Sequence, residues 1–420
     1  MQLCIFEDTH YVNFQPLVYF RPVYDLRCGV STLHEKIESV FSRANIVLHV
    51  RKELEAYARQ LYPQMSVNHL SEEDTWFING RILAGREFAR TIQSHDQRQE
   101  VFLHDENGVG AAFVKGKNVF RLARYLKQPL KETVFQNLPM KKSSFQAVRY
   151  LWDIVYHTAE EIENDVSRIR KNLRQQSHKV KIPQGAHLIH PENIFLGSRC
   201  IVKPGVVLDA EQGAIVIGDD VTIMPNAVIQ GPAYIGNKSI VKIGAKIYHG
   251  TSIGEYCKVG GEIEASVMQS YSNKQHDGYL GHSYIGSWVN LGADTNTSDL
   301  KNTYGTVKVE NDGAVIDTGM QFIGLIMGDH SKTGINAMFD TGAIVGISCN
   351  IYGAEIPPKF IPSFSWGEKD SLTVFQLKKG LETARRVFAR RDVEMTDVYE
   401  KLFRKVYALT DKSRKNAGVK

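Results

Sequence analysis

Residues 217–263 read IGDDVTIMPNAVIQGPAYIGNKSIVKIGAKIYHGTSIGEYCKVGGEI, and this stretch decides the fold. An aliphatic residue returns every six positions from Ile217 to Val259, and a mostly small residue follows each one four positions later. An α-helix repeats every 3.6 residues and a strand every two, so neither explains this period. A hexapeptide period is typical of short strands that tight turns join and stack into a parallel solenoid. The stretch therefore predicts a left-handed parallel β-helix whose interior holds the aliphatic side chains.

The repeat is interrupted near 265–278 and again near 296–315, and it then resumes as far as Ile347. A solenoid tolerates insertions as loops at its corners, and such loops usually carry binding residues. We therefore expect a site at these breaks. About eight coils leave flat outer faces, which related architectures bury as homotrimers, so we expect a homotrimer with sites shared between subunits.

Composition limits the possible partners. The 420 residues are 43% hydrophobic and 23% charged, with a net charge of +5, and this length predicts two or three domains. No dense run of Lys or Arg suggests a nucleic-acid groove, whereas phosphate-bearing partners are compatible with the charge. No apolar stretch reaches the length of a membrane span, and Met1 to His10 resembles a strand more than a secretory signal. Five scattered cysteines fit a reduced, cytoplasmic protein.

Four segments follow from the patterns along the chain. Residues 1–143 alternate strand-like and helix-like segments, including helices over Leu33–Arg43 and Lys52–Leu61, which predicts an α/β domain with a largely parallel sheet. Residues 144–184 are predicted to form a helical connector, 185–355 the β-helix, and 356–420 a C-terminal helical extension. The basic end of the chain, 412–420, is expected to be a frayed, solvated tail.

Two motifs in the solenoid carry a resemblance to known enzymes. The stretches HDGYLG (276–281) and VNLGA (289–293) resemble the acetyltransferase half of bifunctional glucosamine-1-phosphate acetyltransferase/N-acetylglucosamine-1-phosphate uridyltransferases. The stretch GDHSKTGIN (328–336) resembles a K-T-G-I-N turn in the archaeal versions. The resemblance implies acyl transfer from acetyl-CoA to an amino sugar.

Acyl transfer from a thioester to an amine needs a base, because the amine loses a proton as it attacks, and a histidine titrates near neutral pH. The resemblance implies that His276 is this base and that Tyr279 orients the substrate. The alternative for His276 is a surface side chain bonded to its neighbours. His282 is expected to pack or to support a neighbouring group. A zinc site of His249, His276 and His282, as in β-helical carbonic anhydrases, is a further alternative that the uneven spacing disfavours.

Two positions depart from the family pattern. Glu264 stands where the family has a lysine that binds the sugar phosphate, and Asp299 stands where it has an asparagine. Both changes disfavour a phosphorylated sugar or change which sugar fits, and Lys242 or Lys246 is the alternative source of positive charge. The expected substrate-binding residues of the solenoid are Lys242, Asn290, Asp299 and Lys332.

The N-terminal segment resembles a divergent sugar nucleotidyltransferase group fused to hexapeptide domains, which includes glucose-1-phosphate thymidylyltransferases. The resemblance rests on CIFED (4–8) and RPVYDLRCGVSTL (21–33). Arg21 takes the place of the lysine in the family's Pro-Lys pair, and the segment 27–29 takes that of its paired glycines. It implies transfer of a nucleotidyl group from UTP or dTTP to a sugar 1-phosphate, with Mg²⁺.

Such a transfer needs cations around the phosphates and carboxylates for the metal. The expected phosphate-binding and sugar-binding residues are Arg21, Asp25, Arg27, Gly29, Arg51 and Lys52. Asp8 and Asp105 are the expected metal ligands, with Asp25 a further candidate. For each arginine the alternative is an internal salt bridge. The chain lacks an early Gly-rich loop, and Asn79-Gly80-Arg81 stands where the family places a metal-binding aspartate.

Three functions follow. The first is a two-site enzyme of nucleotide-sugar synthesis, the second a nucleotidyltransferase whose β-helix only trimerises the protein. The third is a non-catalytic sugar-nucleotide sensor.

Overall fold

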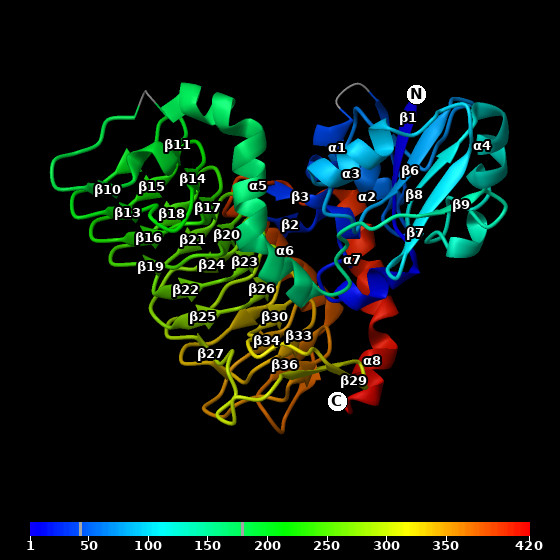
Figure 1. Ribbon diagram of the computed structural model, residues 1–420. Helices are drawn as coiled ribbons and strands as arrows, with labels where there is room; N and C mark the ends of the chain where they lie inside the picture. Colours follow the sequence, from blue (N-terminus) through cyan, green and yellow to red (C-terminus); the bar gives the residue numbers. More distant parts are fainter. Residues whose placement is uncertain (42–43, 178–179) are drawn as a thin grey trace. The chain divides into compact units, whose positions relative to one another are not determined.

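The computed structural model describes residues 1–41, 44–177 and 180–420 (Figure 1). They form two compact units. The α/β unit comprises Met1–Leu26, Ser31–Tyr150 and Thr396–Lys405. The solenoid unit comprises Arg27–Val30, Leu151–Met395 and Val406–Lys420.

The α/β unit is built on one seven-stranded sheet of order β5-β4-β1-β6-β8-β7-β9. Its strands are β1 (Gln2–Phe6), β4 (Asn45–Leu48), β5 (Ser66–Val67), β6 (Thr75–Asn79), β7 (Val101–Asp105), β8 (Gly108–Val114) and β9 (Met140–Lys142). β1 pairs in parallel with β4 and β6, as predicted, but β8 is antiparallel to both β6 and β7. β4 also pairs in parallel with β5, and β7 with β9, so the prediction of a largely parallel sheet is confirmed. The exception is β8, which a tight turn ending at Gly108 (φ 96°) joins to β7 as a hairpin.

Helices complete this unit. They are α1 (Leu33–Val40), α2 (Glu55–Leu61), α3 (Arg86–Gln93), α4 (Gly116–Ala123) and the first part of α7 (Asp397–Leu409). α1 starts at a capping box, in which the Thr32 hydroxyl accepts from the Glu35 amide and the Glu35 carboxylate accepts from the Thr32 amide. The predicted end of this helix at Arg43 lies outside the described residues. Tyr399 of α7 stacks on Phe20 at 5.1 Å, so part of the C-terminal extension belongs to this unit.

The solenoid unit consists of short parallel strands in three stacked sheets (Figure 1). The first contains β10 (His187–Ile189), β13 (Val207–Asp209), β16 (Val228–Gln230), β19 (Lys246–Ile247), β22 (Glu262–Glu264) and β25 (Tyr279–Gly281). The second contains β11 (Ile194–Leu196), β14 (Ile215–Ile217), β17 (Ala233–Ile235), β20 (Thr251–Ile253), β23 (Val267–Met268), β26 (Tyr284–Ile285), β30 (Ile326–Met327), β33 (Ile344–Val345) and β35 (Phe360–Ile361). The third contains β12 (Ile201–Val202), β15 (Thr222–Ile223), β18 (Ile240–Val241), β21 (Lys258–Val259) and β24 (Asn273–Lys274).

Further strands continue the stack. They are β31 (Lys332–Thr333), β34 (Asn350–Ile351), β36 (Ser365–Gly367) and β37 (Thr373–Val374), with β27 (Asn296–Thr297) paired to β32 (Met338–Phe339). The hairpin of β28 (Lys308–Asn311) and β29 (Ala314–Asp317) and the small pair β2 (Arg27–Cys28) and β3 (Ser31–Thr32) complete the list. β35 and β36 follow residue 355, so the coils extend beyond the predicted end of the β-helix.

The coil register follows the hexads. Val216 pairs with Tyr234, eighteen residues on, and Ile223 pairs with Val241 in the same way, so three hexads make one coil. The aliphatic hexad residues form one continuous buried core. Burying each aliphatic side chain contributes about 1.5–3 kcal/mol. The predicted left-handed parallel β-helix is confirmed.

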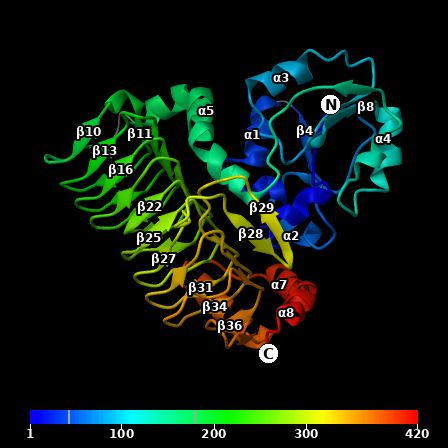
Figure 2. The ribbon, with the colours of Figure 1, turned by 60° about the horizontal axis from the view of Figure 1, so that its bottom comes forward.

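The two breaks in the repeat differ in kind. At the first, Lys258 pairs with Asn273, only fifteen residues on. This coil is therefore shorter than the regular coil of eighteen residues, and it contains no inserted loop. Glu262 pairs with Tyr279, seventeen residues on, so the turn 275–278 gains two residues within this short coil. The second break is an insertion. Tyr284 pairs with Ile326, and the β28–β29 hairpin lies between them in the chain (Figure 2).

Helices cover parts of the solenoid. α5 (Leu151–Ser177) contacts β11, β17 and β20 (Figure 1), and α6 (Leu377–Ala389) and α8 (Asp411–Asn416) follow the last coil. The expectation of a frayed tail is wrong. Arg414 is only 2% exposed, and the Val374 amide donates to the Lys420 carbonyl, which ties the end of the chain to β37. Among the helices formed by the described residues, none has the length and apolar character needed to span a bilayer.

Candidate functional site

Tyr279 is the centre of a polar cluster on the solenoid. It lies on β25 beside β22, and its hydroxyl oxygen is 3.0 Å from Glu264 Oε2 and 3.0 Å from Asp299 Oδ2. Burial, and then the charges of Asp299 and Glu264, raise the pKa of Tyr279. The hydroxyl therefore keeps its proton at neutral pH and donates it to one carboxylate or the other. The two residues that depart from the family pattern thus meet at the predicted substrate-orienting tyrosine.

His282 supports Asp299. Its Nδ1 lies 2.8 Å from Asp299 Oδ2, and its ring stacks on Phe322 at 5.0 Å. The Tyr156 hydroxyl donates to the Phe322 carbonyl at 3.0 Å, which fixes the stacking partner. This agrees with the expected supporting role of His282.

His276 lies in the enlarged turn 275–278 and is exposed. The buried Lys274 amino group donates to the His276 carbonyl at 3.0 Å and to the Asp277 carbonyl at 3.3 Å, so the backbone of the turn is anchored from inside the coil. In the part of the chain that the structure describes, the imidazole makes no hydrogen bond, so its nitrogens are available to a substrate. Within one chain, the described residues also bring no three His, Cys, Asp or Glu side chains together as a metal site, so His249, His276 and His282 do not converge there.

The remaining predicted solenoid residues lie on another face. Asn290 bridges β24 and β31 through pairs with Asn273 and Lys332, whereas Tyr279 belongs to the sheet of β22 and β25. Lys242 follows β18, in the same sheet as β24. The structure therefore separates Asn290, Lys332 and Lys242 from the Tyr279 cluster.

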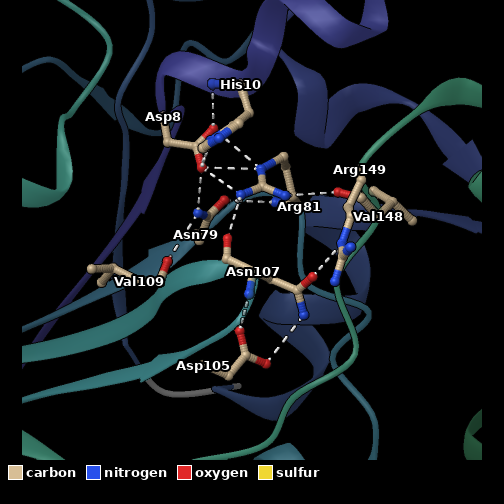
Figure 3. A network of polar contacts seen from close by, with 9 residues as sticks. All are labelled: Asp8, His10, Asn79, Arg81, Asp105, Asn107, Val109, Val148 and Arg149. Atoms are coloured by element: carbon tan, nitrogen blue, oxygen red, sulfur yellow. Dashed lines mark hydrogen bonds and ion pairs between the residues drawn. The ribbon is translucent and has the colours of Figure 1, made fainter. Parts of the chain in front are cut away.

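In the α/β unit, Asp8 is the centre of a second network (Figure 3). Arg81 Nε lies 3.1 and 3.0 Å from the two carboxylate oxygens of Asp8, and its Nη2 lies 2.6 Å from Oδ2. Asn79 Nδ2 donates to the same Oδ2 at 2.9 Å. Burial alone would raise the pKa of Asp8, but bonds from His10 and the Arg81 charge hold the pKa of this carboxyl well below its usual range.

Asp105, the other predicted metal ligand, contacts Asn107. Its carboxylate accepts from the Asn107 amide at 2.6 Å and from Asn107 Nδ2 at 3.1 Å (Figure 3). Asp8 is neutralised by a guanidinium, and within residues 1–41, 44–177 and 180–420 no metal-binding group of carboxylates forms. The Arg81 guanidinium already neutralises Asp8, so this carboxylate does not fit a Mg²⁺ site. Asp105 contacts Asn107 and not Arg81, and its role as a metal ligand stays a prediction.

A cavity of about 310 Å³ lies beside Asp8, where β1 and β6 end. Its walls include Asp8, His10, Asn79 and Lys131. Parallel strands commonly bind ligands at this edge of a sheet. None of the six residues predicted to bind phosphate or sugar lines this cavity: Arg21, Asp25, Arg27, Gly29, Arg51 and Lys52.

Those residues have other partners. Arg51 is buried and pairs with Glu7 at 2.5 Å, and Asp25 lies 3.0 Å from His34 Nδ1. Arg21 donates to the Leu17 carbonyl at 2.8 Å, whereas Lys52 is exposed. For Arg51, the alternative of an internal salt bridge describes the structure.

Arg27 and Gly29 belong to the solenoid unit. Arg27 is buried, donates to the Val30 carbonyl, and lies 5.2 Å from the centroid of the Tyr234 ring. The Gly29 carbonyl accepts from Ser252 Oγ at 2.6 Å, and a Cβ at Gly29 (φ 85°) would lie 2.8 Å from the backbone of Glu161. Close packing explains this glycine, so the assignment of the segment to the nucleotidyl-transfer loop is not supported.

Comparisons with known proteins match two parts of the chain. Residues 3–174 match the family model described as sugar nucleotidyl transferase, and residues 214–242 match that of the bacterial transferase hexapeptide (six repeats). The chain is thus similar to sugar nucleotidyltransferases over residues 3–174 and to hexapeptide transferases over residues 214–242.

Among curated proteins, the chain is similar to "Bifunctional protein GlmU" from Synechococcus sp. (strain CC9311), with 29% identity over 42% of this chain and 35% of that protein. GlmU from Thermosipho africanus is 23% identical over 63% of this chain and 62% of that protein. The chain thus covers less than two thirds of the length of these relatives. A solved structure titled "UDP-N-acetylglucosamine acyltransferase from Campylobacter jejuni" aligns at 13% identity with a TM-score of 0.29, over 54% of this chain and 96% of that one.

Sequence reasoning missed several residues of these sites. The sequence marks Arg81 only as standing where the family has an aspartate, because its bond to Asp8 joins residues 73 positions apart. The pairing of Asp25 with His34 gave no signal in the sequence. The carboxylates around Tyr279, in contrast, were found as departures from a motif.

Proposed function

We propose that this chain is an enzyme of nucleotide-sugar synthesis whose solenoid acetylates the amine of an amino sugar with acetyl-CoA. The observation that carries the proposal is the Tyr279 hydroxyl between Glu264 and Asp299, in the coil that also presents the exposed His276. An amino sugar arrives as an ammonium ion, and two carboxylates favour this cation over a phosphate.

In the proposed reaction, the substrate ammonium first loses one proton to solvent. The neutral amine nitrogen then attacks the thioester carbonyl carbon, an N–C bond forms, and His276 accepts the second proton of the nitrogen. The C–S bond breaks, and the coenzyme leaves as a thiolate that takes this proton from His276 to become the thiol. Tyr279 donates a hydrogen bond and positions the acceptor, because its proton is retained at neutral pH.

The test is consumption of acetyl-CoA with a panel of amino sugars, with and without a 1-phosphate. We expect His276→Ala to lower turnover about a hundredfold or more. His249→Ala is the matched control, since His249 is also exposed on the solenoid and should leave the rate unchanged. Equal rates for wild type and His276→Ala would reject His276 as the general base.

For the α/β unit we propose transfer of a nucleotidyl group from UTP or dTTP to a sugar 1-phosphate, with release of pyrophosphate. The family match over residues 3–174 supports it. No step through Mg²⁺ is assigned to Asp8, because Arg81 already pairs with its carboxylate.

The Asp8–Arg81 pair favours a second candidate for this unit, a domain that binds a sugar nucleotide without transferring it. Pyrophosphate release from a panel of triphosphates and sugar 1-phosphates, with Mg²⁺ present, separates the two. Release with only one of the triphosphates identifies the nucleobase of the substrate and supports nucleotidyl transfer. Nucleotide binding by calorimetry without any release supports the sensor.

A further inference from the structure

A second cavity lies within the solenoid unit, and we call it the α6 cavity. It has a volume of about 320 Å³, and its walls include Lys258, Asn273, Asn290, Lys332, Arg390 and Arg391. The first four come from the β-helix, and the two arginines directly follow α6. Nothing in the proposed chemistry at Tyr279 uses it.

The β-helix wall of the α6 cavity is a ladder of polar side chains. Lys258 pairs with Asn273, Asn273 with Asn290, and Asn290 with Lys332, so one position recurs in four successive coils. The residues that follow each of them, Val259, Lys274, Leu291 and Thr333, are buried. Because neighbouring side chains alternate in a strand, the ladder faces out of the prism and into the cavity.

The charge of the α6 cavity is uncompensated. Its four cations are Lys258, Lys332, Arg390 and Arg391, and no carboxylate lines it. Arg391 donates to Asn273 Oδ1 at 2.7 Å and Lys332 Nζ to the His330 carbonyl at 2.7 Å, both neutral acceptors. None of the four forms an ion pair with an acidic group of the described chain.

Both lysines of the α6 cavity have a lowered pKa, so their charged forms are destabilised. Burial lowers the pKa of Lys258, and the charges of Arg391, Lys242 and Arg390 lower it further. Burial lowers the pKa of Lys332 to about 8. A bound anion would relieve both effects, since an opposite charge favours the protonated amine.

The rings in the wall exclude one kind of ligand. Trp288 is covered on both sides, by Tyr271 at 4.2 Å and by Phe388 at 4.1 Å. No face of this ring is free to stack on a nucleobase. The amides of Asn273, Gln275 and Asn290 instead provide hydrogen-bonding groups for a small polar body.

We propose that the α6 cavity binds a phosphate group, held by cations from both the β-helix and the segment after α6. A sugar phosphate and the phosphates of coenzyme A share this chemistry. The site is distinct from the Tyr279 cluster, whose carboxylates disfavour phosphate, and its occupation does not require that His276 catalyse acyl transfer.

The test is calorimetric titration of the full chain with inorganic pyrophosphate, glucosamine 1-phosphate and coenzyme A in separate arms. Lys258→Met and Arg390→Gln each remove one charge, and we expect each to weaken binding roughly tenfold or more. Lys412→Met is the control, because Lys412 is an exposed cation of the same C-terminal extension outside the cavity.

Binding of at least one probe that both cavity variants weaken and the control does not supports the proposal, and the arm that binds identifies the source of the phosphate. The proposal is overturned if no probe binds, or if the cavity variants bind as tightly as wild type. Unchanged melting temperatures confirm that the variants are folded. If Lys258→Met lowers the melting temperature, Arg390→Gln decides, since Arg390 is exposed.

Discussion

The Tyr279 hydroxyl lies between two carboxylates and can donate a hydrogen bond to either of them. Glu264 and Asp299 come from different coils and would repel each other, but one hydroxyl serves both and His282 supports Asp299. The cluster remains negative overall. This explains why acceptance of an amine, rather than of a phosphate, is the expected property of this face.

Tyr279→Phe tests this at the residue scale. The variant keeps the ring and loses the shared donor, so the two carboxylates are less well held and the acceptor is less well oriented. We expect kcat/KM for the amino sugar to fall about ten- to a hundredfold, as for loss of a hydrogen bond to a charged group. Steady-state kinetics measure the fall, and an unchanged kcat/KM would show that the hydroxyl does not contact the acceptor.

At the element scale, the short coil has an unusual interior. Lys274 pairs with Val259 and occupies an inward position, where it is 1% exposed. Its amino group donates to three backbone carbonyls, those of Gly260, His276 and Asp277. A lysine in an aliphatic position therefore holds the enlarged turn in place.

Lys274 also gives the solenoid a pH dependence. Burial lowers its pKa from 10.5 to about 8, although Asp277 and Asp294 oppose the shift. Below pH 8 both folded and unfolded chains are protonated, and the cost of the buried charge is present in full. Between pH 8 and 10.5 the folded chain loses its proton first, so this residue's contribution to stability rises by on the order of 3 kcal/mol.

We therefore expect the melting temperature of Lys274→Met, relative to wild type, to fall as the pH rises from 7 to 10. Thermal unfolding at a series of pH values measures this difference. Lys203→Met, which removes an exposed lysine of the same solenoid, should show a difference that does not change with pH. A flat difference for Lys274→Met as well would contradict the lowered pKa.

The fold was more predictable than the sites, for a physical reason. Each hexad places its own aliphatic residue inside the prism, so the six-residue spacing alone predicts that Ile223 and Ile247 are buried. The hairpin of β7 and β8 and the helix caps depend on a few neighbours. The Asp8–Arg81 bond and the packing of Gly29 against Glu161 depend on residues far apart in the chain, and a single sequence carries no periodic signal for such pairs.

At the scale of the whole molecule, the flat faces of the solenoid suggest how copies of the chain assemble. We propose a homotrimer, because long flat β-helix faces are commonly buried between copies of the chain. The expected result is a mass of three protomers by light scattering at micromolar concentration. A monomer under these conditions would contradict the trimer and would place the complete acyl site within one chain.

The aromatic rings at one corner of the solenoid give the molecule an optical property. Tyr256, Tyr271, Trp288 and Phe388 stack in sequence, with centroids 4.8, 4.2 and 4.1 Å apart. Rings this close couple their electronic transitions, so Trp288 should dominate the near-ultraviolet circular dichroism among the four tryptophans of the chain. Because Phe388 belongs to α6, loss of that signal without loss of the far-ultraviolet spectrum would report the release of α6 from the coils, in real time and without a label.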